Sequence, residues 1–99
     1  MPDGLRLSHN LAMILQTIGA GQSYAYTILG ATGLPSGTVY PALRRLEEEE
    51  LVRAEWESPA DAAGPPRKSF RLTGTGETAL AAARQRYPLL TRMAEVKEV

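Results

Sequence analysis

The sequence predicts a mainly α-helical fold that carries one small β-hairpin. Three segments with helical spacing of apolar residues fill the first half of the chain, two short alternating apolar–polar segments follow, and a long helical segment ends it. With 99 residues, the chain has room for one domain and not for two. A chain of this size buries roughly two-thirds of its unfolded surface, so it can fold alone.

Two helices are expected before the first tight turn. The first is predicted over residues 8–19 with Ser8 as its N-cap, because apolar residues recur at positions i, i+3, i+4 and i+7. These residues are Leu11, Ile14, Leu15 and Ile18. The second helix follows Ser23, and Gly33 is suited to end it in a left-handed conformation. Its inner face is expected to be Ala25, Ile28, Leu29 and Thr32.

A third helix is expected after the turn at residues 33–35, with Ser36 as its N-cap. Its core stripe is Val39, Ala42, Leu43 and Leu46. The opposite side carries Gly37, Pro41, Arg44 and Glu48, flanked by Tyr40 and Arg45. That side has no large aliphatic residue, is slim at its N-terminal end and is cationic in its middle, which stability alone does not explain.

The alternation of apolar and polar residues over 52–57 and again over 68–72 predicts a hairpin. Residues 58–66 carry three prolines and a glycine and are expected to be the loop between its strands. Phe70 and Leu72 share one face and should be buried. Trp56 is expected in the core of the hairpin, rather than as a platform on which a ligand stacks.

A long helix is expected from residue 75 to the end of the chain, bent near Pro88, which lacks an N–H group. We therefore divide the chain into residues 1–74, with the hairpin at 51–72, and a C-terminal helix at 75–99. The helix carries an apolar stripe that looks too long for the rest of the chain to cover, which favours a homodimer. The residues expected in that dimer are Leu11, Leu80, Tyr87, Leu90 and Met93.

Composition excludes several classes of protein. The chain has no cysteine, which excludes disulfides and thiolate chemistry and fits a reducing cytoplasm. No apolar run approaches the roughly 20 residues that cross a bilayer, and the first residues show no secretory signal. His9 is the single histidine and is expected to be a polar residue of a first helical turn. We find no catalytic set of residues, and we predict no enzyme, metal or cofactor.

The order of elements is that of a winged helix-turn-helix domain, in which the hairpin is the wing. The slim, cationic side of the third helix has the shape and charge that suit the major groove of DNA. Arg67 and Lys68 lie where a wing would meet a phosphate backbone, although they would also keep a hairpin edge soluble. Arg44 can likewise pair with Glu47 or Glu48 on a solvated helix face. Zero net charge and the acids at 47–50 leave a second hypothesis open, a winged-helix module for protein–protein contact.

Two stretches, "SGTVYPALRRLEEEELV" and "GPPRKSFRLTGTGETAL", closely resemble the PadR family of bacterial transcriptional regulators, and "SYAYTIL" is similar to the family's second helix. The resemblance covers roughly residues 11–80. It implies a homodimeric winged-helix repressor that binds an inverted repeat in double-stranded DNA, and several such proteins respond to small planar aromatic compounds. The short C-terminal part resembles the subgroup in which one last helix makes the dimer.

The resemblance also implies roles for single residues. Contacts to bases or phosphates would come from Ser36, Thr38, Tyr40 and Arg44, with Arg67 and Lys68 in the wing and Tyr24 at the DNA backbone. One departure concerns the end of the third helix, where Glu50 stands at a position at which the family usually has glycine. We therefore expect strain or a different cap at Glu50. Gly74, Ser69 and Ala25 are further departures.

Overall fold

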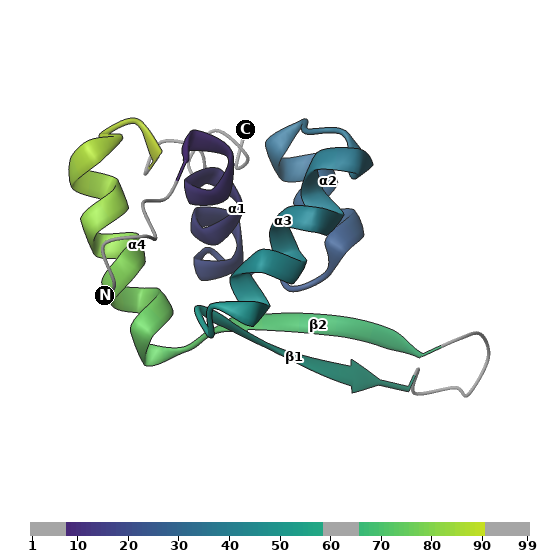
Figure 1. Cartoon of the computed structure of the whole chain (residues 1–99). Coiled ribbons are helices and arrows are strands. Elements are labelled where there is room, and N and C mark those ends of the chain that lie inside the picture. Colours follow the sequence, from purple (N-terminus) through teal and green to yellow (C-terminus); the bar gives the residue numbers. More distant parts are fainter. Residues whose placement is uncertain (1–7, 59–65, 91–99) are drawn as a thin grey trace.

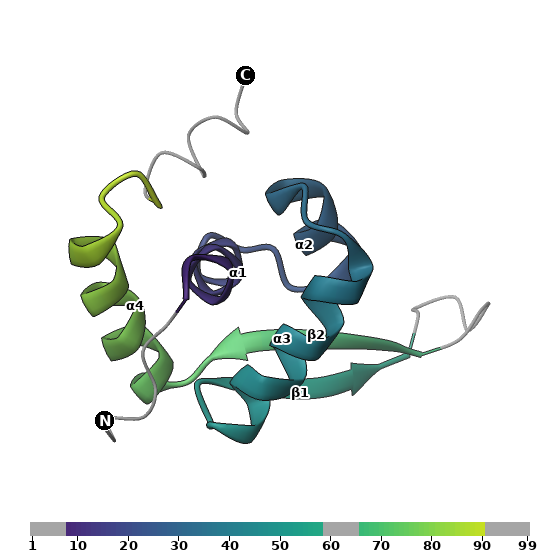
Figure 2. The ribbon, with the colours of Figure 1, turned by 45° about the horizontal axis from the view of Figure 1, so that its top comes forward.

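The structure is a computed structural model that describes residues 8–58 and 66–90. Helix α1 lies between α4 on one side and the α2–α3 pair on the other, and the hairpin runs beneath them and projects beyond α3 (Figure 1). Figure 2 shows α1 nearly end-on between α4 and α2. The elements are α1 (His9–Gly19), α2 (Ala25–Thr32), α3 (Ser36–Glu48), β1 (Val52–Glu57), β2 (Arg67–Leu72) and α4 (Gly74–Arg86). The winged helix-turn-helix architecture is confirmed.

Helix α1 is the centre of the hydrophobic core. Ser8 caps it as predicted, because its hydroxyl accepts a hydrogen bond from the N–H of Leu11 at 3.2 Å. The side chains of Ile14 and Leu15 are completely buried. The buried Gln16 accepts a hydrogen bond from Nε of Arg84 at 3.0 Å, which ties α1 to α4.

The turn between α2 and α3 follows the sequence prediction with one exception. Gly33 ends α2 in the left-handed region, at φ +73°, and its N–H donates to the carbonyl of Leu29. The N-cap of α3 is Pro35 and not Ser36, which is the first helical residue. Proline's fixed φ suits the extended cap, and its carbonyl accepts from the N–H groups of Thr38 and Val39. The predicted core stripe is confirmed, with Val39, Leu43 and Leu46 buried.

The two strands pair antiparallel, from Val52 opposite Leu72 to Glu57 opposite Arg67. The residues before α2 extend this sheet, since Ser23 accepts a hydrogen bond from the N–H of Phe70 at 2.8 Å. Phe70 is buried as predicted, but Trp56 is 70% exposed, so its expected place in the core of the hairpin is wrong. Burial fades along β1 because its far end projects past the helices (Figure 1).

The chain turns sharply from α3 into β1, where α4 also begins. The N–H groups of Glu50 and Leu51 donate to the carbonyls of Glu47 and Leu46, which is a Schellman motif. Glu50 has φ +62°, so the strain expected from its departure from the family pattern is present. Next to it, Thr73 caps α4 by accepting a hydrogen bond from the N–H of Gly76, and donates its hydroxyl to the carbonyl of Glu50 at 2.7 Å.

The C-terminal helix differs from its prediction. Helix α4 ends at Arg86, so the chain leaves the helical conformation before Pro88, and the part of the predicted helix beyond residue 90 lies outside the described residues. A residue that precedes proline is disfavoured in the helical region, and Tyr87 leaves it with φ −126° and ψ 79°. No helix in residues 8–58 and 66–90 is both long and apolar enough to cross a membrane.

The apolar stripe is also covered more fully than expected. Leu11, Leu80 and Leu90 are all buried within the chain's own core, so the premise that they need a partner is wrong. Tyr87 is half-buried, and its ring meets that of His9 edge-on, with the two ring centroids 5.1 Å apart. Leu89 is 69% exposed, whereas Met93 lies outside the described residues.

Candidate nucleic-acid interface

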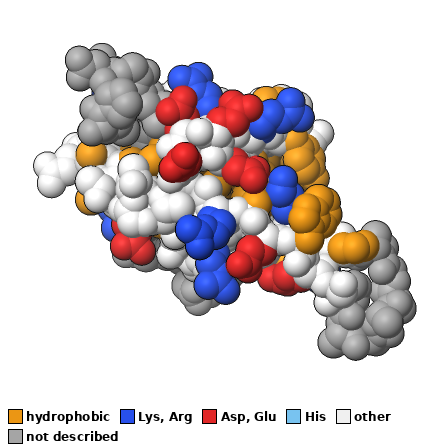
Figure 3. Space-filling view, turned by 60° about the horizontal axis from the view of Figure 1, so that its bottom comes forward, with side chains coloured by type: hydrophobic (Ala, Val, Ile, Leu, Met, Phe, Trp, Pro, Cys, Tyr) orange, Lys and Arg blue, Asp and Glu red, His pale blue; other side chains and the backbone are white. Residues whose placement is uncertain are grey.

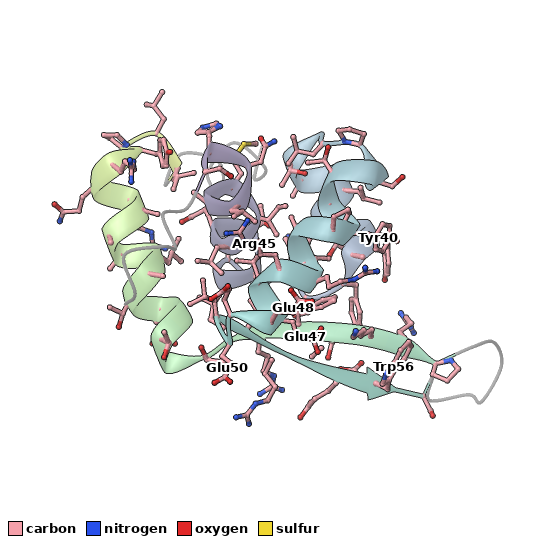
Figure 4. The ribbon with its side chains drawn as sticks, viewed as in Figure 1. Tyr40, Arg45, Glu47, Glu48, Glu50 and Trp56 are labelled. Atoms are coloured by element: carbon pink, nitrogen blue, oxygen red, sulfur yellow. The ribbon has the colours of Figure 1, made fainter. Side chains whose placement is uncertain are left out.

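A groove with a volume of about 360 Å³ opens between the start of α2, the outer side of α3 and the far part of the hairpin. We call it the wing groove. Its aromatic lining includes Tyr24, Tyr26, Tyr40 and Trp56, and its charged lining is Arg44, Arg67, Lys68 and Glu47. Figure 4 shows Tyr40 on α3 and Trp56 on β1 on the same side of the molecule. Segments far apart in the sequence therefore build one surface.

Among the described residues, the outer side of α3 is open at its N-terminal end. A Cβ atom added at Gly37 would meet nothing within 4 Å. Of the predicted contact residues of α3, Ser36, Tyr40 and Arg44 are exposed, and Thr38 is half-buried. Tyr40 keeps 51% of its surface exposed. The described part of the chain thus leaves this side open, as a helix that enters a DNA groove requires.

The two wing cations hold different partners. Nζ of Lys68 lies 3.4 Å from Oε1 of Glu47 and 5.7 Å from the ring centroids of Trp56 and Phe70. Arg67 lies with its guanidinium 5.4 Å from the ring centroid of Tyr24. Both cations border the wing groove, where the sequence predicted a wing contact, but Lys68 reaches back to α3.

The hydroxyl of Tyr24 has a hydrogen-bond partner within the same chain. It donates a hydrogen bond to Oε1 of Glu57 at 2.6 Å, and the ring of Tyr24 stacks on Tyr26 at 5.7 Å. The hydrogen bond to Glu57 raises the pKa of Tyr24 above its ordinary value, with smaller contributions from desolvation and the Glu57 charge. The same bond, followed by one from Ser69, lowers the pKa of Glu57. The Tyr24 hydroxyl is therefore bonded to a residue of the wing. Tyr26 is 57% exposed, and its hydroxyl lies 3.4 Å from Nη1 of Arg67.

Sequence reasoning missed three residues of the groove: Tyr26, Trp56 and Glu47. Tyr26 lies two positions from Tyr24 at the start of α2 and is not on the predicted inner face of that helix. An aromatic residue off the inner face was a signal that could have been used. Trp56 was misplaced because alternation reveals which face of a strand a residue lies on, but not how far the strand projects. Glu47 was grouped with the other acids at the end of α3. However, successive residues of a helix point about 100° apart, so Glu47 and its neighbours face different sides.

The charges of this region are mixed. In Figure 3, Lys and Arg side chains are interspersed with Asp and Glu side chains, and hydrophobic side chains gather toward the far end of the hairpin. This distribution agrees with the zero net charge of the chain. Among residues 8–58 and 66–90, no three His, Cys, Asp or Glu side chains come together as a metal ion would require.

Comparison with known proteins connects this geometry to a family. Among solved structures, a PadR-like transcription factor from Bacteroides fragilis is 29% identical, with 86% of this chain and 85% of that chain covered and a TM-score of 0.69. A Streptococcus transcriptional regulator is 26% identical over 90% of this chain and 91% of that one, with a TM-score of 0.67.

A more distant structure, the PcaV regulator of Streptomyces coelicolor in complex with its natural ligand, shares the fold at 20% identity. It has a TM-score of 0.70, with 87% of this chain and 59% of that chain covered. No curated protein sequence matches the chain. A sequence model of the "Transcriptional regulator PadR-like family" matches residues 14–82, more than half of the chain. The chain therefore belongs to the PadR-like family of transcriptional regulators.

Proposed function

We propose that this protein is a sequence-specific repressor that binds double-stranded DNA with α3 in the major groove and the hairpin as its wing. The observation that carries the proposal is the open outer side of α3, which joins a groove with three cations, Arg44, Arg67 and Lys68. Cations suit phosphates, and a guanidinium suits the acceptor pair of guanine. Membership of the PadR-like family supports the same function.

The proposed contacts divide into two kinds. Arg44 is the residue we assign to base recognition, with Tyr40 beside it, because both project from the middle of α3 and are exposed. Ser36 and Thr38 lie in the first turn of α3, where N–H groups and hydroxyls suit a phosphate. Arg67 and Lys68 would meet the backbone next to the wing, and Tyr24 would hold Arg67 in place.

We further propose that two copies bind an inverted repeat. A two-fold dimer would set its recognition helices one turn of DNA apart, about 34–36 Å. The exposed Leu89 and the half-buried Tyr87 support a dimer contact in this part of the chain, whereas Met93 lies outside the described residues. Release by a small aromatic effector is part of the proposal, supported by the resemblance to the PadR family and by the ligand that PcaV, which shares the fold, binds.

The test begins with selection of bound sequences from random duplex DNA, which reports both binding and the spacing of half-sites. The selected duplex is then titrated at several salt concentrations. The proposal expects a palindromic site and an affinity whose logarithm falls linearly with the logarithm of the salt concentration. Failure to enrich any sequence, or binding that does not depend on salt, contradicts it.

A second function, a module for protein–protein contact, is favoured by one observation, the mixed charge of the surface in Figure 3. The exposed acids Glu48, Glu49 and Glu50 follow the cationic part of α3 directly. The Arg44→Glu substitution separates the two functions. A DNA-binding regulator loses its operator, whereas a protein–protein module keeps its cellular complexes intact.

A further inference from the structure

Lys68 does not extend away from the protein, as a free wing cation would. Its Nζ lies 3.4 Å from Oε1 of Glu47 on α3, and the rings of Trp56 and Phe70 lie at 5.7 Å. The contact with Glu47 joins residues 21 positions apart in the sequence and crosses the wing groove. Within residues 8–58 and 66–90, this ion pair joins the wing to the proposed recognition helix.

Stability does not explain this ion pair. The side chains of Lys68 and Glu47 are 37% and 41% exposed, and exposed pairs of this kind contribute little to folding. An acid in the last turn of a helix also opposes the helix dipole, so Glu47 is unfavourable for α3 itself. Glu48, Glu49 and Glu50 are exposed, and Glu47 is the acid of this run that lines the groove.

We propose that Glu47 is an intramolecular competitor of DNA, which holds Lys68 in the free protein in the place that a phosphate takes in the complex. This inference rests on the proposed function. A carboxylate and a phosphate oxygen accept the same charge-assisted hydrogen bonds, and the compact ammonium of lysine serves as one point charge. DNA binding must therefore break the Glu47–Lys68 pair, and this cost lowers the affinity for every duplex by a similar factor.

The pair also has a structural consequence in the free protein. It joins β2 to the last turn of α3, so it favours one position of the wing relative to the recognition helix before DNA arrives. Arg67 interacts with Tyr24 and Tyr26 instead, and the carboxylate beside it is Glu57 of β1, not an acid of α3. Of the two wing cations, Lys68 is thus the one whose contribution to DNA binding is controlled by an acid of α3.

Six proteins test the proposal: wild type, Glu47→Gln, the control Glu48→Gln, Lys68→Met, and the two double variants that combine Lys68→Met with each glutamine substitution. Glu48 is the neighbouring exposed acid of α3, so its substitution removes the same charge without touching the pair. At low salt we expect Glu47→Gln to bind the selected duplex about two- to fivefold more tightly than wild type, the scale of one exposed ion pair. Glu48→Gln should give a smaller gain.

The double variants show whether the gain in DNA affinity comes from breaking the Glu47–Lys68 pair or from removing any negative charge. In the Lys68→Met background, the gain from Glu47→Gln should shrink to that of Glu48→Gln, because the competitor has nothing left to hold. Lys68→Met should also make the salt dependence less steep by about one phosphate contact. If Glu47→Gln and Glu48→Gln give equal gains in both backgrounds, the competition is disproved and the regulator function stands.

A measurement without DNA separates the two proposals. Trp56 is the single tryptophan of the chain and lies beside the Lys68 ammonium, so its fluorescence reports where that charge is. Glu47→Gln should change the emission of Trp56 in the free protein, whereas Glu48→Gln should not. An unchanged emission overturns the pair itself. A changed emission in proteins that bind no duplex overturns the proposed function, and with it the role of Glu47 as a competitor of DNA.

Discussion

The wing groove and the junction where α3, β1 and α4 meet lie at two places along the same helix, and they are built in opposite ways. The junction is held by backbone hydrogen bonds around Leu46, Leu51 and Thr73, with the first two side chains buried. The groove is held by exposed side-chain contacts such as Tyr24–Glu57 and Lys68–Glu47. Stability should therefore depend on the junction, and recognition on the groove.

Two glycine substitutions test most strongly whether stability depends on the junction and not on the groove. A Cβ atom at Gly76 would overlap the carbonyl oxygen of Leu51, whereas at Gly37 it would meet nothing within 4 Å. We expect Gly76→Ala to lower the free energy of unfolding by about 3 kcal/mol, as overpacked sites do. Gly37→Ala should raise it by about 0.5–1 kcal/mol through helix propensity. Urea unfolding of both variants measures this, and equal stabilities would contradict the close contact at the junction.

Arg44→Ala tests the groove side of the comparison. We expect a loss of about 2 kcal/mol in binding to the selected duplex, with relaxed preference at one base pair, because one bidentate contact is removed. The free energy of unfolding should stay within about 0.5 kcal/mol of wild type, since Arg44 is exposed. Parallel DNA titration and urea unfolding check both. A large loss of stability would show that Arg44 supports the fold instead.

Glu50→Gly tests how much backbone strain at the junction lowers the stability of the fold. Glu50 has φ +62°, a conformation that glycine adopts without the clash of a side chain, so we expect a gain in unfolding free energy of about 1 kcal/mol. The matched control is Glu49→Gly, which removes the same charge at φ −85° and should be neutral or destabilising. Thermal or urea unfolding distinguishes them. A gain shared by both variants would mean that charge, and not backbone strain, is responsible.

Tyr24→Phe should have the smallest effect, because its partner contact is exposed. The hydrogen bond from Tyr24 holds the pKa of Glu57 below its ordinary value, so the associated stability is present above the pKa of unfolded Glu57. That stability is lost as the pH falls through the lower pKa of the folded state. In the variant, an NMR titration should find the pKa of Glu57 closer to its ordinary value. An unchanged pKa would contradict the bond.

Local signals were enough for much of the fold. The cap at Ser8, the left-handed Gly33 and the buried Val39, Leu43 and Leu46 were all predicted, because each depends on neighbours within a few residues. The exposed outer side of α3 was predicted for the same reason. The cap of α3 was placed one residue late, since both Pro35 and Ser36 carry features of a helix start.

Other features required the packing of distant segments. Leu80 and Leu90 were expected to need a partner, but both are buried in the core of the chain itself, and a periodic pattern cannot reveal how much core is available. Trp56 was expected in the core, yet the hairpin extends beyond the helices. The pairs Lys68–Glu47 and Tyr24–Glu57 join residues 21 and 33 positions apart, so no local rule could have found them.

The sequence by itself determined the order of the elements, the core stripe of α3 and the slim, cationic side opposite that stripe. Helical and strand periodicities, caps and turns are properties of adjacent residues, and the chain carries them before it folds. The tertiary structure alone decided that α2, α3 and the hairpin enclose one groove, and that a glutamate of α3 holds a lysine of the wing. Those features depend on the distance between segments, which is fixed only when the core packs.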